Sequence, residues 1–271
     1  LPSNRACDVI AHDLNGNGFD DVVLCQNHTA DSFTTQSLIY RGSPDIDPKD
    51  PVKLETFDPR RVFPVHSPGQ KTPAIAFINH YSRLIHQVNP TIFYGGPDGY
   101  SAKRSEEVYG VGTVEALRCD IDDDGKPDLI FANSSHNSKS RDPGSFVYLN
   151  GPNGFGSKPD YVLPTMKASG IVCADIDHDG YLDLIVSGYF NEEIVVFRGT
   201  PDGFDIDNPQ RIRVEHEGVV FNYGLWLFLA DLNNNGWLDL VVPQTQFDRS
   251  FVLWGGPDGF SSERMQLLSV D

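Results

Sequence analysis

The stretch Asp175-Ile-Asp177-His-Asp179-Gly180-Tyr-Leu-Asp183 places four carboxylates and one glycine within nine residues. It runs directly into the apolar segment Leu184-Ile-Val186. The same arrangement, D-x-[DN]-x-[DN]-G-x-x-D, occurs four times, at residues 13–21, 120–128, 175–183 and 231–239. We call these segments the acidic loops and number their positions 1 to 9. Chance rarely produces one such string in a chain of 271 residues, so four of them indicate repeated structural units.

A second string, close to G-x-P-D-G-[FY], recurs along the chain with a regular spacing. Its prolines stand at positions 44, 97, 152, 201 and 257, so they are separated by 53, 55, 49 and 56 residues. A proline followed by Asp-Gly predicts a tight turn. The period of about 54 residues predicts five copies of one supersecondary unit.

The residues around the acidic loops have strand character. Runs such as Val22-Val-Leu24 and Leu240-Val-Val242 are β-branched and apolar. Four antiparallel strands in about 50 residues are typical of a β-propeller blade. We therefore predict an all-β fold, a single β-propeller domain over residues 1–271 with about five four-stranded antiparallel blades. The approximate blades are residues 1–58, 59–110, 111–164, 165–216 and 217–271.

The second unit has lost its acidic loop. Shifting the third unit back by 54 residues aligns Lys126-Pro127-Asp128 with Thr72-Pro73-Ala74. The proline, the apolar run that follows it and a later asparagine all match. The ligand positions have become His66, Pro68, Gln70 and Ala74. We infer that this unit keeps the scaffold pattern without the acidic side chains.

Side chains at positions 1, 3, 5 and 9 of a tight loop supply many oxygen atoms to one point, which suits calcium better than magnesium. The glycine at position 6 permits a sharp turn, and the carbonyl of position 7 would add a backbone ligand. The alternative is a polar hairpin turn rich in Asp, Asn and Gly. We predict about four calcium ions, one in each of the four loops. The predicted ligands are Asp13, Asn15, Asn17, Phe19 and Asp21; Asp120, Asp122, Asp124, Lys126 and Asp128; Asp175, Asp177, Asp179, Tyr181 and Asp183; and Asp231, Asn233, Asn235, Trp237 and Asp239.

Together, the acidic loops and the G-x-P-D-G-F turns resemble FG-GAP/VCBS repeats, which build the calcium-loop β-propellers of integrin α-subunits and of many bacterial secreted proteins. The resemblance covers all five units, the second only by its scaffold. It implies calcium loops on one rim of a propeller, an extracellular or cell-surface location, and a role in adhesion or glycan binding. Members of the family usually have seven or eight blades, so the chain is either a closed five-bladed ring or part of a larger, seven-bladed propeller.

Composition restricts the partners. The chain has 38 acidic and 21 basic residues and a formal net charge of −17. Nucleic acids and anionic membranes need clustered Lys and Arg, so neither is expected as a main partner. The sequence holds no apolar run near the roughly 20 residues of a membrane helix, so we predict that it is not transmembrane. Because the chain begins with Leu1, we expect it to be processed, trimmed or a fragment.

The loops that leave the second strand of each unit are expected on the face opposite the acidic loops, and they vary most. Amides stand at the first position of four of them, and aromatic side chains lie nearby. Amides and aromatic rings suit sugar hydroxyls and sugar faces. The alternative is that these amides cap their own backbone. The candidate ligand-binding residues are Gln26, Asn79, His80, Tyr81, Asn133, Tyr189 and Gln244.

We therefore expect a non-catalytic, extracellular, calcium-binding propeller that binds a carbohydrate or a protein through this loop face. No catalytic residue is assigned. One alternative is a polysaccharide-active enzyme of the lyase type, in which His80, Tyr81 and Arg83 would act as base, acid and carboxylate neutraliser. Another is a ligand-free scaffold module of a larger surface protein.

The four cysteines show no C-x-x-C spacing, so zinc or redox chemistry is not expected. Cys7 and Cys25 flank one hairpin and either pair across it or stay as buried thiols. Cys119 and Cys173 stand one and two places before their acidic loops. This offset predicts opposite strand faces and argues against a bond between them.

Overall fold

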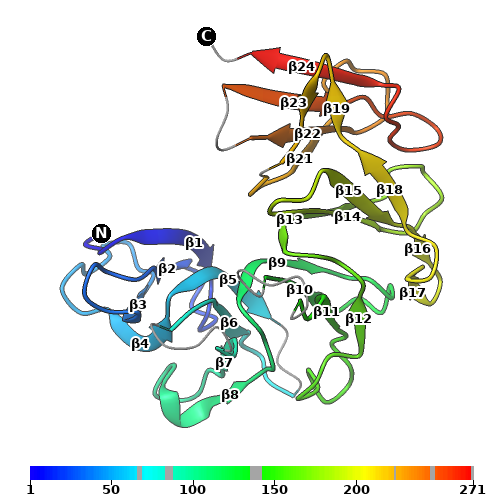
Figure 1. The fold of residues 1–271 in the computed structure, drawn as a ribbon. Helices are drawn as coiled ribbons and strands as arrows, with labels where there is room; N and C mark the ends of the chain where they lie inside the picture. Colours follow the sequence, from blue (N-terminus) through cyan, green and yellow to red (C-terminus); the bar gives the residue numbers. More distant parts are fainter. Residues whose placement is uncertain (66–68, 83–87, 135–141, 223, 245–247, 270–271) are drawn as a thin grey trace. The chain divides into compact units, whose positions relative to one another are not determined.

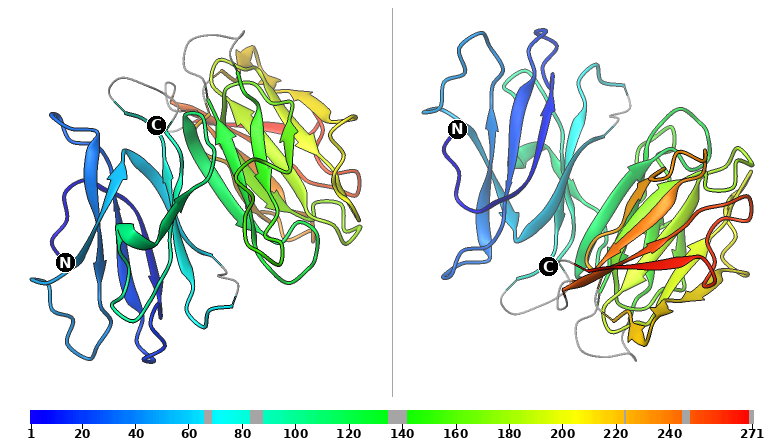
Figure 2. Two further views of the ribbon diagram at one scale, coloured as in Figure 1. Left: turned by 90° about the horizontal axis from the view of Figure 1, so that it is seen from below. Right: turned by 90° about the horizontal axis from the view of Figure 1, so that it is seen from above.

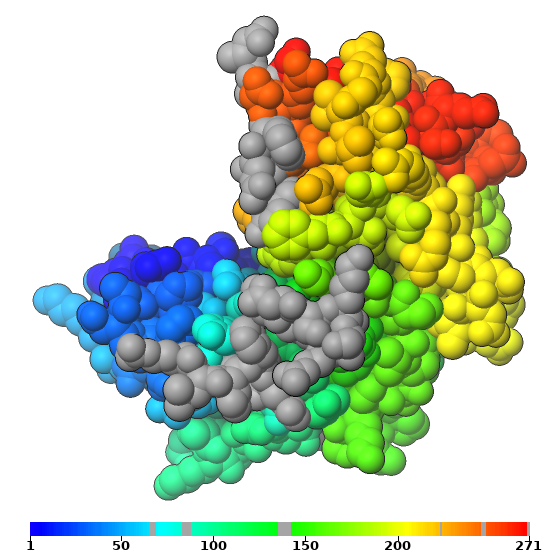
Figure 3. Space-filling view, in the orientation of Figure 1, coloured from blue at the N-terminus to red at the C-terminus, as the bar shows by residue number. Residues whose placement is uncertain are grey.

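The computed structural model describes the chain except for residues 66–68, 83–87, 135–141, 223, 245–247 and 270–271, which are grey in Figures 1 and 3. The described residues are almost entirely strands and turns, with one short 3-10 helix at Ala102–Arg104 and no α-helix. They form five four-stranded sheets and two two-stranded ribbons. The predicted all-β, propeller-like fold is confirmed at this level.

Each four-stranded sheet follows the order of the chain, and its neighbouring strands are consecutive except in the fourth sheet, where a short ribbon separates the last two strands. Figure 2 shows this for the first sheet, drawn in blue. The first sheet comprises β1 (Ala6–His12), β2 (Asp21–Gln26), β3 (Thr34–Tyr40) and β4 (Val52–Phe57). The second comprises β5 (Pro59–Val65), β6 (Ala74–Asn79), β7 (Thr91–Phe93) and β8 (Ser105–Glu107).

The remaining three sheets repeat this pattern. The third comprises β9 (Thr113–Cys119), β10 (Asp128–Asn133), β11 (Ser145–Tyr148) and β12 (Tyr161–Leu163). The fourth comprises β13 (Ala168–Ala174), β14 (Asp183–Gly188), β15 (Glu193–Phe197) and β18 (Gln210–Arg213). The fifth comprises β21 (Phe228–Ala230), β22 (Asp239–Pro243), β23 (Arg249–Leu253) and β24 (Met265–Ser269). The ribbons pair β16 (Gly199–Thr200) with β17 (Gly203–Phe204) and β19 (Glu215–His216) with β20 (Val219–Val220).

Each four-stranded sheet lies inside one of the residue ranges expected for the blades. By packing, the chain divides into two compact units. The first holds Leu1–Arg118, Lys126–Phe131 and Val147–Tyr161, and the second holds Cys119–Gly125, Ala132–Phe146 and Val162–Asp271. That the sheets form a single propeller domain, and that five blades complete it, stay predictions.

The second strand of a sheet is the most buried, which explains its continuous apolar sequence. All six residues of β6, β10 and β14 are buried. A strand covered on both faces loses the alternation of polar and apolar side chains. In the first unit, Val23, Ile75 and Phe77 belong to one buried cluster. In the second, Ile185 and Leu240 belong to another.

The expectation that Cys119 and Cys173 point away from each other is wrong. Their Sγ atoms lie 3.5 Å apart. Side chains alternate between faces along one strand, but these two residues belong to β9 and β13, strands of different sheets. Position in the sequence relative to a loop therefore did not fix which side chains face each other.

Candidate metal centre and ligand pocket

Every acidic loop connects the first strand of a sheet to the second. Residues 13–21 join β1 to β2, 120–128 join β9 to β10, 175–183 join β13 to β14, and 231–239 join β21 to β22. In three loops the residue before position 1 pairs with position 9, as Ala174 pairs with Asp183. The prediction that each loop joins two strands is confirmed.

The aspartate at position 1 accepts hydrogen bonds from the backbone of its own loop. Asp175 Oδ2 accepts from Gly180 N at 3.0 Å, and its Oδ1 accepts from Asp179 N at 3.1 Å. The position-6 glycines have φ between +83° and +95°, a backbone conformation that side chains disfavour. In loop 13–21 the N–H groups of residues 15 to 18 all point at Asp13, and that of Gly18 contributes most to lowering the pKa of its carboxyl group.

The aspartate at position 9 is buried and ties the loop to a later turn of the same sheet. Asp183 Oδ2 accepts from Ile176 N at 3.2 Å, and its Oδ1 accepts from Gly199 N at 2.8 Å. Asp239 repeats both bonds with Leu232 and Gly255, at 2.9 Å each. Burial is the main cause that raises the pKa of Asp183, and these N–H groups oppose the rise. Position 9 therefore has a structural task besides any metal ligation.

The hydrogen bonds from Gly199 to Asp183 and from Gly255 to Asp239 explain why the G-x-P string begins with glycine. A Cβ atom on Gly199 would lie 2.5 Å from Leu182 O, and one on Gly255 would lie 2.1 Å from Leu238 O. Only a residue without a side chain lets the turn approach this closely. The turn string and the acidic loop are thus two parts of one contact in the fourth and fifth sheets.

Three carboxylates converge in each of the two most acidic loops. One oxygen each of Asp120, Asp122 and Asp124 lie within 4.8 Å of one another. The corresponding group in loop 175–183 is Asp175, Asp177 and Asp183. Donor sets made only of oxygen fit a hard cation such as calcium. The structure therefore brings together positions 1, 3 and 5 of one predicted ligand set and positions 1, 3 and 9 of another.

In the amide-containing loops, the side-chain amides take part in hydrogen bonds within the loop. Asn15 Nδ2 donates to Asp21 Oδ2 at 3.1 Å, and Asn233 Oδ1 accepts from Asn235 N at 3.0 Å. At position 7, the N–H donates to the position-5 side chain at 2.9 Å in three loops. These three residues are Phe19, Tyr181 and Trp237. Ligation by the position-7 carbonyls, including that of Lys126, stays a prediction.

Arg198 places a cation on loop 175–183. Its Nη1 lies 2.9 Å from Asp177 Oδ2 and 3.3 Å from Asp183 Oδ2. Its Nη2 donates to Asp258 O, in the turn of the fifth sheet, at 2.9 Å. The guanidinium group therefore neutralises positions 3 and 9 of the loop. Sequence reasoning missed it, because Arg198 lies 15 residues beyond Asp183.

The two neighbouring loops of the second unit also touch through aromatic side chains. His178, at position 4, stacks on Trp237, at position 7 of the next loop, with ring centroids 4.3 Å apart. Position 4 has positive φ in Asp123, His178 and Asn234. This left-handed conformation is most accessible to Gly, Asn, Asp and His, which accounts for the residue types at a position that the sequence pattern leaves open.

At the other end of the second strands, the predicted amides are buried and bind backbone. Asn79 Nδ2 donates to Asn89 O at 2.9 Å, and Asn133 Nδ2 donates to Gly144 O at 3.0 Å. Gln26 bonds Asn4 N and Gln36 O. Gln244 is 6% exposed, and its amide has no hydrogen-bond partner among the described residues. The capping alternative thus describes Gln26, Asn79 and Asn133.

The remaining predicted ligand residues lie in the same loops. His80 is buried with Nδ1 3.0 Å from Thr113 O. Tyr81 is half-buried and meets the edge of Phe33, with ring centroids 5.0 Å apart. Tyr189 is half-buried and its N–H donates to Lys167 O at 2.9 Å. Arg83 lies outside the described residues, so the His–Tyr–Arg group stays a prediction.

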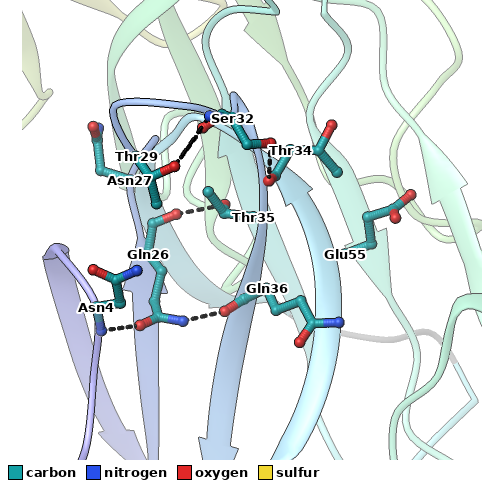
Figure 4. Close-up of a pocket in the computed structure, with 9 residues that line it drawn as sticks. All are labelled: Asn4, Gln26, Asn27, Thr29, Ser32, Thr34, Thr35, Gln36 and Glu55. Atoms are coloured by element: carbon teal, nitrogen blue, oxygen red, sulfur yellow. Dashed lines mark hydrogen bonds between the residues drawn. The ribbon is translucent and has the colours of Figure 1, made fainter.

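Figure 4 shows a pocket of about 440 Å³ at the end of β2 that is remote from loop 13–21. Amide and hydroxyl groups dominate its lining, and Glu55 supplies its one charge. Thr35 Oγ1 donates to Gln26 O at 2.7 Å, and Thr29 Oγ1 accepts from Ser32 N at 3.0 Å. The lining residues are Asn4, Gln26, Asn27, Thr29, Ser32, Thr34, Thr35, Gln36 and Glu55.

Residues 120–186, which include two acidic loops and the strands β10 to β13, match the model of the FG-GAP-like repeat. This segment carries an FG-GAP-like repeat. The chain is 26% identical over 159 residues to integrin alpha-5 of Xenopus laevis, an alignment that covers 51% of this chain and 15% of that protein.

Two solved structures share the fold of the repeats. One is a lectin of Agrocybe aegerita that specifically recognises non-reducing terminal N-acetylglucosamine. Its TM-score is 0.53 at 15% identity, and the match covers 97% of this chain and 66% of that one. The other is the V. cholerae biofilm matrix protein Bap1, with a TM-score of 0.51 at 14% identity, covering 97% of this chain and 40% of that one. The chain thus spans less than two thirds of each of these relatives.

The second repeat keeps the geometry of its neighbours without the acidic side chains. Val65 pairs with Ala74 at the closing position of the hairpin, where Ala174 pairs with Asp183 in the fourth repeat. Ala74 is fully buried, as Asp183 is. The register places Ala74 at position 9, as the sequence alignment predicted, whereas His66 and Pro68 lie outside the described residues.

In the part of the chain that the structure describes, no helix has the length and apolarity needed to cross a bilayer.

Proposed function

We propose that the chain is an extracellular or cell-surface, calcium-binding β-propeller that binds a glycan or a protein and has no catalytic role. The observation that carries the metal part is the convergence of Asp120, Asp122 and Asp124, whose carboxylate oxygens lie within 4.8 Å of one another. Three like charges this close repel each other, and a cation bound among them would offset that repulsion.

Calcium would neutralise this repulsion and hold each acidic loop in shape. About four ions are proposed, one in each acidic loop, through the ligands predicted from the sequence. Because the loops join the first two strands of their sheets, calcium would stabilise the native state relative to the unfolded chain. The integrin relative and the FG-GAP-like repeat match support this assignment.

For the ligand, we propose a neutral glycan bound at the loops opposite the acidic loops. The pocket at the end of β2 has the chemistry that sugar hydroxyls require, because its amides and hydroxyls can both donate and accept. Asn4, Thr34, Gln36 and Glu55 are the exposed residues of its lining. The lectin and the biofilm matrix protein that share the fold support a binding or adhesion role. The predicted loop residues Tyr81 and Tyr189 would each offer aromatic surface in its own loop.

One observation favours the runner-up, a polysaccharide-active enzyme. His28 Nδ1 lies 2.7 Å from Asp58 Oδ1, and Asp58 is only 1% exposed. A carboxylate that orients a histidine is the usual arrangement of a general base. His28 stands between Asn27 and Thr29 of the pocket, and Asp58 directly follows β4. Release of unsaturated sugar products from acidic polysaccharides would favour this function.

A glycan array probed with and without calcium tests the proposal. We expect binding of neutral glycans that is weakened at least tenfold by Gln36→Ala, which removes an amide from the pocket wall. Gln266→Ala is the matched control, since Gln266 is an exposed glutamine on β24. Absence of binding to every glycan in the presence of calcium would contradict the glycan assignment. An equal loss of glycan binding in both variants would contradict the assignment of this pocket as the binding site.

A further inference from the structure

The four cysteines of the chain lie in two close pairs. Cys7 Sγ is 3.7 Å from Cys25 Sγ, and Cys119 Sγ is 3.5 Å from Cys173 Sγ. All four are free thiols in the structure. Four cysteines allow three disulfide patterns, and only one of these patterns joins the neighbours seen here.

We propose that Cys7–Cys25 and Cys119–Cys173 are disulfide bonds in the protein when it resides in an oxidising compartment. A disulfide has an S–S distance of about 2.05 Å, and a rotation about each Cα–Cβ bond moves the sulfurs through a comparable distance. The backbone of the first pair brings the two residues side by side. Cys7 stands at an irregularity of the β1–β2 pairing, between Ala6 and Asp8, which pair with Gln26 and Cys25 on the adjacent antiparallel strand. The Cys7 side chain therefore reaches the strand segment that holds Cys25, as the sulfur separation of 3.7 Å shows.

Each bond requires the removal of two electrons and two protons from two thiols. A disulfide reagent, such as oxidised glutathione or the disulfide of a thiol oxidase, accepts the electrons by exchange. One protein thiol first forms a mixed disulfide and releases one reagent thiol. The second protein thiol then attacks the mixed disulfide and releases the other. The products are one protein disulfide and two reduced thiols.

The second bond has the greater structural consequence. It would join residues 54 apart in sequence, compared with 18 for the first, and longer closed loops restrict the unfolded chain more. Cys119 directly precedes Asp120, and Cys173 stands two residues before Asp175. The bond would therefore fasten the start of loop 120–128 to the start of loop 175–183, whether or not the loops hold a metal.

Peptide mapping of the intact chain, made in an oxidising compartment and alkylated without reduction, tests the pattern. Trypsin places Cys7 and Cys25 in one peptide, residues 6–41, and separates Cys119 (residues 119–139) from Cys173 (residues 168–198). We expect peptide 6–41 with an internal disulfide and peptide 119–139 linked to 168–198. Alkylated thiols at Cys119 and Cys173, or a link from either to peptide 6–41, would overturn the proposal. The result does not depend on calcium or glycan binding.

Thermal unfolding gives a second readout. The double variant Cys119→Ser/Cys173→Ser should lower the melting temperature by about 5–10 °C relative to the oxidised chain. Its melting temperature should be close to that of the reduced wild type. The melting temperature of Cys7→Ser/Cys25→Ser should lie further from that of the reduced wild type. If the first double variant fails to fold, the peptide map of the wild type still decides the pattern. A wild-type melting temperature that is unchanged by reductant, with both bonds mapped as absent, would overturn the proposal.

Discussion

Arg198 Nη1 lies 2.9 Å from Asp177 Oδ2, so a side chain of the chain itself supplies positive charge to loop 175–183. The same nitrogen reaches Asp183 Oδ2 at 3.3 Å. Charge counting alone ranks loops 120–128 and 175–183 as equals, since each has four carboxylates at ligand positions. The guanidinium group makes the two loops unequal as calcium sites. A calcium ion in loop 175–183 would have to displace the guanidinium group or share carboxylate oxygens with it.

We therefore expect loop 175–183 to bind calcium more weakly than loop 120–128. Arg198→Gln should strengthen binding at loop 175–183 by roughly tenfold, since it removes a competing charge from a half-buried site. Isothermal titration calorimetry with calcium measures the effect. Arg211→Gln is the matched control, because Arg211 forms an ion pair with Glu193, away from the loop. Unchanged or weaker affinity in the Arg198 variant would contradict competition.

The two ends of an acidic loop should respond differently to removal of a carboxylate. Asp183 accepts from Gly199 through Oδ1 and from Ile176 through Oδ2, and Asp183→Asn replaces one of these two acceptor oxygens by an N–H₂ donor. It should cost about 2–3 kcal/mol of unfolding free energy even in a calcium chelator. Asp179→Asn, at exposed position 5, should weaken calcium binding and leave the stability in chelator nearly unchanged. Denaturant unfolding measures both, and equal effects in chelator would rule out the structural task of position 9.

The glycine of the turn string should tolerate no side chain. Gly255→Ala would place Cβ 2.1 Å from Leu238 O and displace the N–H that binds Asp239. We expect a loss of about 2–4 kcal/mol. Gly151→Ala is the control, because its Cβ would meet no atom closer than 3.9 Å. Similar unfolding midpoints for the two variants would show that the close approach carries no energetic weight.

Much of the fold follows from local patterns in the sequence. The acidic loops and turn strings marked the hairpins, and the register of Val65 with Ala74 agrees with the slot assigned to the missing loop. These features depend on residues near each other in the chain, so spacing reveals them. The strong preference of position 4 for left-handed backbone could also have been read from Asp123, His178 and Asn234.

The contacts that sequence reasoning missed are long-range. Arg198 reaches the loop from the end of β15, and Cys119 meets Cys173 from another sheet. Burial also changed the meaning of the amides. Asn79 and Asn133 satisfy backbone groups that burial would otherwise leave unpaired. A pattern of residue types shows that such groups are available, but only the packing decides which partner they use.

The central claim is that the acidic loops bind calcium and that this binding stabilises the fold. Its most direct test is the melting temperature of the wild type and of Asp122→Asn/Asp124→Asn, each in excess calcium, in magnesium and in chelator. Binding restricted to the native state should raise the wild-type melting temperature by about 5 °C or more in calcium over chelator. The variant, which loses two of the three convergent carboxylates of loop 120–128, should show a smaller rise. Identical wild-type melting temperatures in calcium and in chelator would contradict the claim.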